Sequence, residues 1–145
     1  MKDQFYLHFP IMPTGTSQQK GVRIVNGKPM FYEKKKVKSA EAEFLTALKP
    51  FRPKAPSDKP IKLTIWFAFD TKKKKLWGQP KPTRPDTDNY LKLFKDCMTT
   101  VGFWKDDAQV VDERVFKTYA ENATIMVRWE EINEIQKEGV RIWLH

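Results

Sequence analysis

The sequence predicts an α+β protein, a single small domain in which two main helices pack on a mixed β-sheet. Apolar residues recur at helical spacing in two segments, at about 34–48 and 89–101. Between them, from Ile61 to Phe69, apolar side chains alternate as they do in a β-strand. The chain has 145 residues, of which 40% are hydrophobic and 13% aromatic, so it is long enough and apolar enough to bury one core.

Further strands are expected on both sides of these helices. Asn26-Gly27 is a dipeptide typical of tight hairpin turns, so the short apolar runs beside it should pair with each other. Two longer runs near the end of the chain should form an antiparallel pair around Ala120-Glu121-Asn122. The strands predicted in this way cover 5–9, 22–25, 30–32, 109–119 and 123–129.

The chain shows no internal repeat and no linker long enough to divide it. We therefore expect one folded domain over residues 1–131. Residues 132–145 form a C-terminal tail whose structure the sequence leaves open, a short helix followed by a strand at 140–144 being one arrangement. Gly102 is expected to end the second helix, because glycine readily adopts the left-handed conformation that follows a helix C-terminus.

The charge of the chain restricts its partners. The formal net charge is +9, which favours an acidic partner. Nucleic acid is the commonest such partner, and an anionic membrane surface is the alternative. No apolar run approaches the roughly 20 residues of a transmembrane helix, and no apolar N-terminal signal segment is visible, so we expect no membrane partner. The single cysteine, Cys97, cannot form an internal disulfide, which fits a cytoplasmic protein.

The composition also restricts the cofactors. Two histidines and one cysteine are too few for an ordinary zinc site. Any bound metal should therefore have oxygen ligands, which favours Mg²⁺, with Mn²⁺ as a substitute. The sequence contains no phosphate-binding glycine loop, dinucleotide fingerprint or nucleophile elbow, so no organic cofactor is expected. Cys97 lies on the apolar stripe of the second helix and is expected in the core.

Two pairs of carboxylates stand on either side of the second helix. Asp86 and Asp88 precede or begin it, and Asp106 and Asp107 follow a Gly-aromatic turn that is expected to return the chain to the same end of the sheet. Four carboxylates gathered in one place repel one another unless a cation lies between them or one is protonated. The alternative for Asp86 and Asp88 is helix capping, because aspartate is a favoured N-cap residue and acids suit the positive end of the helix dipole.

Basic side chains lie next to the acidic pairs. Lys92 shares a helix face with Asp88 and Asp96, where it either forms a row of ion pairs or reaches a phosphate whose negative charge it offsets. Asn89 is a candidate to orient an aspartate or the substrate. A basic loop precedes the first acidic pair and is either a solvated loop or a track for phosphates. The candidate nucleic-acid-binding residues are Lys72, Lys73, Lys74, Lys75, Lys81, Arg84 and Asn89.

The combined spacing of these motifs resembles one known family. The run Pro85-Asp86-Thr87-Asp88-Asn89 is followed by Leu91-Lys92, by Asp96 and then by Gly102-Phe103-Trp104-Lys105-Asp106-Asp107-Ala108-Gln109-Val110. This pattern resembles the RusA family of Holliday junction resolvases, which are small endonucleases often carried by phages and prophages. The strong resemblance covers about residues 84–116 and extends weakly upstream.

The resemblance implies a fold, an assembly and a reaction. It implies a homodimer of small α+β subunits that requires Mg²⁺, binds four-way DNA junctions and makes symmetric nicks in two strands. By position, the essential carboxylates match Asp86, Asp88 and Asp107, and the essential lysine matches Lys92. Asp106 matches an adjacent acid of the motif and is a further candidate metal ligand.

Two features depart from the family pattern, and two other functions remain open. The segment at 9–14 keeps the family's prolines only loosely, and the tail after about Glu131 has no counterpart. Both features bear on junction selectivity more than on the chemistry. The alternatives are a nuclease that acts on other branched nucleic acids, such as flaps or forks, and a non-catalytic, structure-selective DNA-binding protein whose acids only cap a helix.

Overall fold

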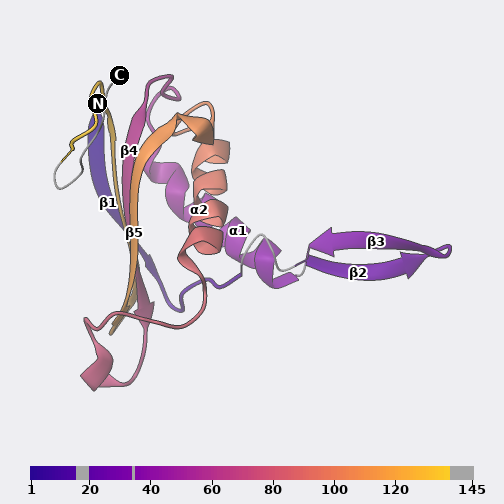
Figure 1. Ribbon diagram of the computed structural model, residues 1–145. Coiled ribbons are helices and arrows are strands. Elements are labelled where there is room, and N and C mark those ends of the chain that lie inside the picture. Colours follow the sequence, from indigo (N-terminus) through magenta and orange to yellow (C-terminus); the bar gives the residue numbers. More distant parts are fainter. Residues whose placement is uncertain (16–19, 34, 138–145) are drawn as a thin grey trace.

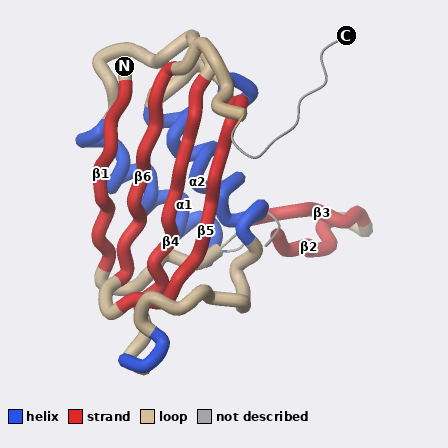
Figure 2. Tube along the Cα trace, turned by 60° about the vertical axis from the view of Figure 1, so that its left-hand side comes forward, coloured by secondary structure: helices blue, strands red, loops and turns tan. Residues whose placement is uncertain are grey.

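The computed structural model describes residues 1–15, 20–33 and 35–137. Within these residues the main body is a four-stranded mixed sheet with two α-helices on one face (Figures 1 and 2). The strand order is β1 (Lys2–Phe9), β6 (Ala123–Glu131), β4 (Ile61–Asp70) and β5 (Val110–Ala120). The helices are α1 (Lys35–Leu48) and α2 (Thr87–Val101). The predicted α+β fold class is therefore confirmed.

The predicted pairing of the last two strands is wrong. β5 and β6 run in opposite directions, but β4 lies between them and pairs parallel with β5 and antiparallel with β6. The connection Glu121-Asn122 therefore spans the end of β4 instead of forming a hairpin turn. The reason is burial: Ile61, Leu63 and Ile65 are all fully buried, so β4 takes the position that is covered by strands on both sides.

The predicted hairpin is confirmed. β2 (Lys20–Val25) pairs antiparallel with β3 (Lys28–Glu33), and the two strands form a separate sheet. Asn26 and Gly27 both have positive φ, at 51° and 75°, as the tight turn of such a hairpin requires. This arm extends away from the four-stranded sheet (Figures 1 and 2). The strand suggested at 140–144 lies outside the described residues.

Gly102 ends α2 as predicted. It adopts a left-handed conformation with φ 106°, and its N–H donates to the carbonyl oxygens of Met98 and Thr99. Phe103 and Trp104 follow at once, and both are essentially fully buried. The indole Nε1 of Trp104 donates to Thr99 Oγ1 at 2.8 Å. Both aromatic side chains therefore belong to the core.

An aromatic cluster joins the two helices to the sheet. The ring of Phe44 on α1 meets the edges of Tyr90 and Phe94 on α2, at centroid distances of 5.8 Å and 5.1 Å. Phe67 on β4 contacts the same two rings at 4.6 Å and 5.8 Å. Cys97 also lies in this core, where burial, followed by the nearby charges of Glu41 and Asp96, raises the pKa of its thiol to about 12. The thiol is therefore a packing group and not a nucleophile.

None of the helices that the structure describes is sufficiently long and apolar to cross a bilayer.

Phe44→Ala should lower the free energy of unfolding by about 3–5 kcal/mol, because it removes a fully buried ring and leaves a cavity between α1 and α2. Val111→Ala on β5 is the control. Its side chain is exposed, and its effect should stay within about 0.5 kcal/mol. Urea unfolding followed by circular dichroism measures both, and equal losses would contradict this account of the core.

Candidate active site

Asp86 stands at the N-cap position of α2, but its side chain does not cap the helix. Its backbone is extended, with φ −67° and ψ 142°, and its carbonyl oxygen accepts the N–H of Tyr90 at 3.0 Å. Within the described part of the chain, no helix N–H donates to its carboxylate. Asn89 Nδ2 lies 3.4 Å from Asp86 Oδ2, close enough to orient it. The capping interpretation therefore does not account for the exposed carboxylate of Asp86.

Two lysines fix the backbone that leads to Asp86. Lys117 Nζ, from β5, donates to the carbonyl oxygens of Thr83 and Pro85 at 2.6 Å and 2.7 Å. Lys81 Nζ donates to the carbonyl oxygen of Arg84 at 2.7 Å and also to the hydroxyl of Thr83. Three successive carbonyls before Asp86 are thus bound by ammonium groups. Hydrogen bonds with a charged donor are stronger than neutral ones, so this loop has a defined shape.

Lys117 was missed in the sequence, because the signal that identifies it appears only once the strand pairing is known. In the parallel pairing with β4, Lys117 is opposite Phe67, which is fully buried. Strand alternation therefore puts a lysine on the face that the helices cover, and such a lysine needs polar partners. Burial lowers the pKa of Lys117 and the charge of Lys81 lowers it further, whereas the charge of Asp86 raises it. Lys117 and Asp86 are thus close enough to influence each other.

Asp88 and Lys92 lie on the outer face of α2. Asp88 is the acid in the first turn of the helix, and its side chain is exposed. Lys92 Nζ lies 3.7 Å from Asp96 Oδ2, and these two side chains are 61% and 47% exposed. An ion pair at that exposure contributes little to stability. Lys92 is therefore available for another anion close to Asp88.

Asp106, unlike Asp86, uses its side chain as a cap. Its Oδ1 accepts the N–H of Ala108 at 2.9 Å, and Gln109 closes a reciprocal capping box on the short 3₁₀ turn Asp107–Gln109. Gln109 Nε2 also donates to the carbonyl oxygens of Ser57 and Lys59. One oxygen of Asp106 is thus engaged in holding the turn. Asp107 is half-buried beside it, directly before β5 begins.

The two acidic pairs lie at opposite ends of α2, contrary to the expectation that the turn would return the chain to the same end of the sheet. The helix has 15 residues, and at 1.5 Å per residue it is about 22 Å long. The length of β5 gives a second estimate of this separation. Lys117 lies beside the loop before Asp86, and Val110 follows the turn that begins at Asp107. Between Val110 and Lys117 the strand advances about 23 Å. Figure 1 shows the two ends apart. Among the described residues, no three acidic, histidine or cysteine side chains are grouped to hold a metal.

The basic loop lies at the same end as Asp86. It leaves β4 after Asp70 and includes the 3₁₀ turn Lys74–Leu76. Lys72, Lys73, Lys74 and Lys75 are all exposed. Trp77 anchors the loop, because its Nε1 donates to the carbonyl oxygen of Thr71 at 2.9 Å while Gly78 N donates to Tyr119. The indole therefore has a structural partner within the loop.

The chain is similar in sequence to known proteins of one family. The model of the family described as "Endodeoxyribonuclease RusA" matches residues 10–130. The chain is 38% identical over 113 residues to the crossover junction endodeoxyribonuclease rusA of Lactococcus phage r1t, a match that covers 77% of this chain and 84% of the relative. It is 46% identical over 55 residues to the crossover junction endodeoxyribonuclease RusA of Escherichia coli strain K12, covering 38% of this chain and 46% of the relative. The uncharacterized protein YqaN of Bacillus subtilis strain 168 is 36% identical over 76 residues, or 52% of this chain and 53% of that protein.

These matches place the chain in the class of endodeoxyribonucleases. Within that class it belongs to the RusA family, as the spacing of its acidic motifs indicated.

Lys117→Met should lower the free energy of unfolding by about 1 kcal/mol, because the carbonyls of Thr83 and Pro85 lose a charged donor at a half-exposed site. Lys105→Met, an exposed lysine beyond the other end of α2, is the control and should change it by less than about 0.5 kcal/mol. Thermal melts measured by circular dichroism compare the two. No difference between them would show that the contacts of Lys117 do not hold the loop.

Proposed function

We propose that this protein is a Mg²⁺-dependent, structure-selective endodeoxyribonuclease that resolves Holliday junctions by paired, symmetric nicks. The observation that carries the proposal is Asp86. Its carboxylate is exposed and not used as a helix cap, it follows a loop bound by Lys81 and Lys117, and Asp88 lies two residues further on. The names of two relatives, which describe crossover junction nucleases, support the choice of substrate.

Asp86, Asp88 and Asp107 are the residues that would hold the divalent cation, with Asp106 beside them. Their carboxylate oxygens are the donors that Mg²⁺ prefers, and Mn²⁺ accepts the same set. The engaged oxygen of Asp106 makes it the weakest candidate of the four. When bound, the cation activates water for attack on a phosphodiester and stabilises the negative charge of the leaving oxygen.

The protein's own side chains would orient the substrate. Asn89 holds the carboxylate of Asp86, and Lys92 extends from the rigid helix toward the scissile phosphate, where its charge offsets the growing negative charge. The exposed lysines of the basic loop would bind the phosphates on either side of the scissile phosphate. Arg84 is exposed in the last part of the same loop.

A homodimer is part of the proposal, because one subunit keeps its acids about 22 Å apart. A two-fold axis that sets α2 antiparallel to the α2 of a second copy would bring Asp86 and Asp88 of one subunit to Asp107 of the partner subunit. The same axis produces a second, identical site. Two sites related by a two-fold axis suit a junction in which two strands are cut symmetrically.

Asp86→Asn and Asp88→Asn should each reduce nicking of a synthetic four-way junction in Mg²⁺ at least about 100-fold, more than is typical for a residue that only orients a metal ligand. Binding to the junction in Ca²⁺ should stay within a few-fold. Asp3→Asn, on the exposed edge strand β1, is the matched control and should nick normally.

Each outcome of that assay has a distinct meaning. Paired nicks in the junction, absent from linear duplex and from both variants, would support the proposal. Stronger cutting of flaps or forks would indicate a nuclease for other branched substrates. Tight junction binding without nicks in Mg²⁺ or Mn²⁺ would leave a non-catalytic DNA-binding protein.

Mixing two inactive variants tests the shared site. In a dimer of one Asp88→Asn subunit and one Asp107→Asn subunit, both substitutions fall in one site and the other site is intact. An equimolar, re-equilibrated mixture should therefore recover about a quarter of the wild-type sites. It should also make single nicks instead of paired ones. Sites built within one subunit would recover no activity, and that result would overturn the proposed arrangement.

A further inference from the structure

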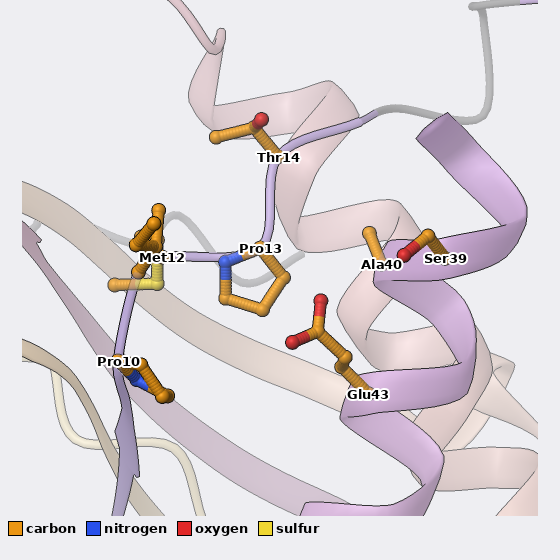
Figure 3. Close-up of a pocket in the computed structure, with 8 residues that line it drawn as sticks. Pro10, Met12, Pro13, Thr14, Ser39, Ala40 and Glu43 are labelled. Carbon is orange, nitrogen blue, oxygen red and sulfur yellow. The ribbon is translucent and has the colours of Figure 1, made fainter. Parts of the chain in front are cut away.

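A pocket lies between the segment that follows β1 and the N-terminal half of α1 (Figure 3). Its volume is about 550 Å³, within the range of sites that bind small molecules. Pro10, Pro13 and Ala40 form apolar walls, and Thr14, Ser39 and Glu43 supply polar groups. The proposed nuclease mechanism uses none of these residues.

The wall formed by the 10–14 segment is fixed in place. Met12 N donates to Asp70 Oδ1, at the end of β4, at 3.1 Å, and the Met12 side chain is buried. The hydroxyl of Tyr90 on α2 donates to the carbonyl oxygen of Pro13. The segment is therefore attached both to the central strand and to the second helix, so the pocket is part of the folded body.

The same contacts place the pocket near the proposed site of cleavage. Tyr90, which holds Pro13, is two residues after Asp88, and its N–H donates to the carbonyl oxygen of Asp86. Burial raises the pKa of the Tyr90 phenol, and the charge of Glu43 raises it further. Glu43 is therefore close enough to Tyr90 for its charge to act on the phenol.

The chemistry of the pocket selects among the parts of a DNA strand. Figure 3 shows the Glu43 carboxylate directed from α1 into the space beside Pro13. A carboxylate repels phosphate and accepts hydrogen bonds from N–H groups. Apolar ring faces such as those of Pro10 and Pro13 suit a flat, apolar surface. A nucleobase has both properties, because it offers a flat face, and adenine, cytosine and guanine carry an exocyclic amino group that thymine lacks.

We propose that this pocket receives one nucleobase of the strand that is cut, and that Glu43 accepts a hydrogen bond from the exocyclic amino group of that base. The proposal rests on the proposed function. It adds a source of sequence preference close to the cleaved bond, in a protein that otherwise binds phosphates. Taking a base out of the stack is least costly where pairing is already disturbed, as at the branch point of a junction.

The test is a panel of four-way junctions in which the bases beside each cleaved bond are varied. The wild-type protein should prefer a base with an amino group at one position by about 10-fold, the discrimination expected of one base-edge contact. Substituting an analogue that lacks only that amino group, such as purine for adenine, should remove the preference. The Glu43→Ala variant should nick junctions at similar rates whichever base occupies that position.

Two further variants sharpen the comparison. Glu43→Gln keeps the size of the side chain and adds donors, so it should cut sites with thymine better than the wild-type protein does. Glu41→Gln, the neighbouring acid on α1, does not line the pocket and should keep the wild-type preference. Melting temperatures of all variants show whether the fold is kept, which is expected because Glu43 is exposed.

The possible failures are distinguishable. If the wild-type protein nicks junctions but Glu43→Ala keeps the same base preference, the pocket assignment is wrong and the nuclease proposal stands. If the wild-type protein nicks no junction, both the proposed function and the pocket assignment are wrong. A second readout places 2-aminopurine next to the preferred base, in a junction bound by Asp88→Asn protein. Its fluorescence should rise as the base leaves the stack, and no rise would overturn the assignment.

Discussion

The parallel pairing of β4 with β5 is the constraint on which the rest of the structure depends. Parallel neighbours cannot be joined by a tight turn, so the chain must cross back over the sheet, and α2 is that crossover. The loop before α2 and the turn after it are therefore held at opposite ends of one helix. This fixes the basic loop and Asp86 at one end and Asp107 at the other. The proposed shared site follows from this separation, because it takes one end of α2 from each of two subunits.

Local electrostatics explains how a strongly basic chain keeps an acidic site exposed. Lys81 and Lys117 do not neutralise Asp86 by direct pairing; they bind the carbonyl oxygens that precede it. The carboxylate stays exposed, while its backbone is set by two charged donors. Asp106 shows the opposite arrangement, since its side chain holds a turn through the N–H of Ala108. Aspartate thus has a different role at each end of α2.

Several features that suit a DNA substrate converge at one end of the molecule. The exposed lysines after β4, the start of α2 and the pocket beside Glu43 all adjoin the end of the central strand, where Asp70 also holds the 10–14 segment. The charged loop suits phosphates, and the pocket suits a base. Contacts to phosphates position a nucleic acid without reading its sequence, so the proposed base pocket would add a contact that depends on the base.

The sequence by itself determined the elements and the motif: alternation predicted β4, helical spacing predicted α1 and α2, and Gly102 ended α2 where expected. These features depend on local backbone geometry, which is determined within a single segment of the chain. Tertiary structure decided the strand order, the separation of Asp86 from Asp107 and the role of Lys117. Each of these depends on the position of β4 between β5 and β6. The pocket at Glu43 belongs to the same group, since its walls come from segments about thirty residues apart that only the fold brings together.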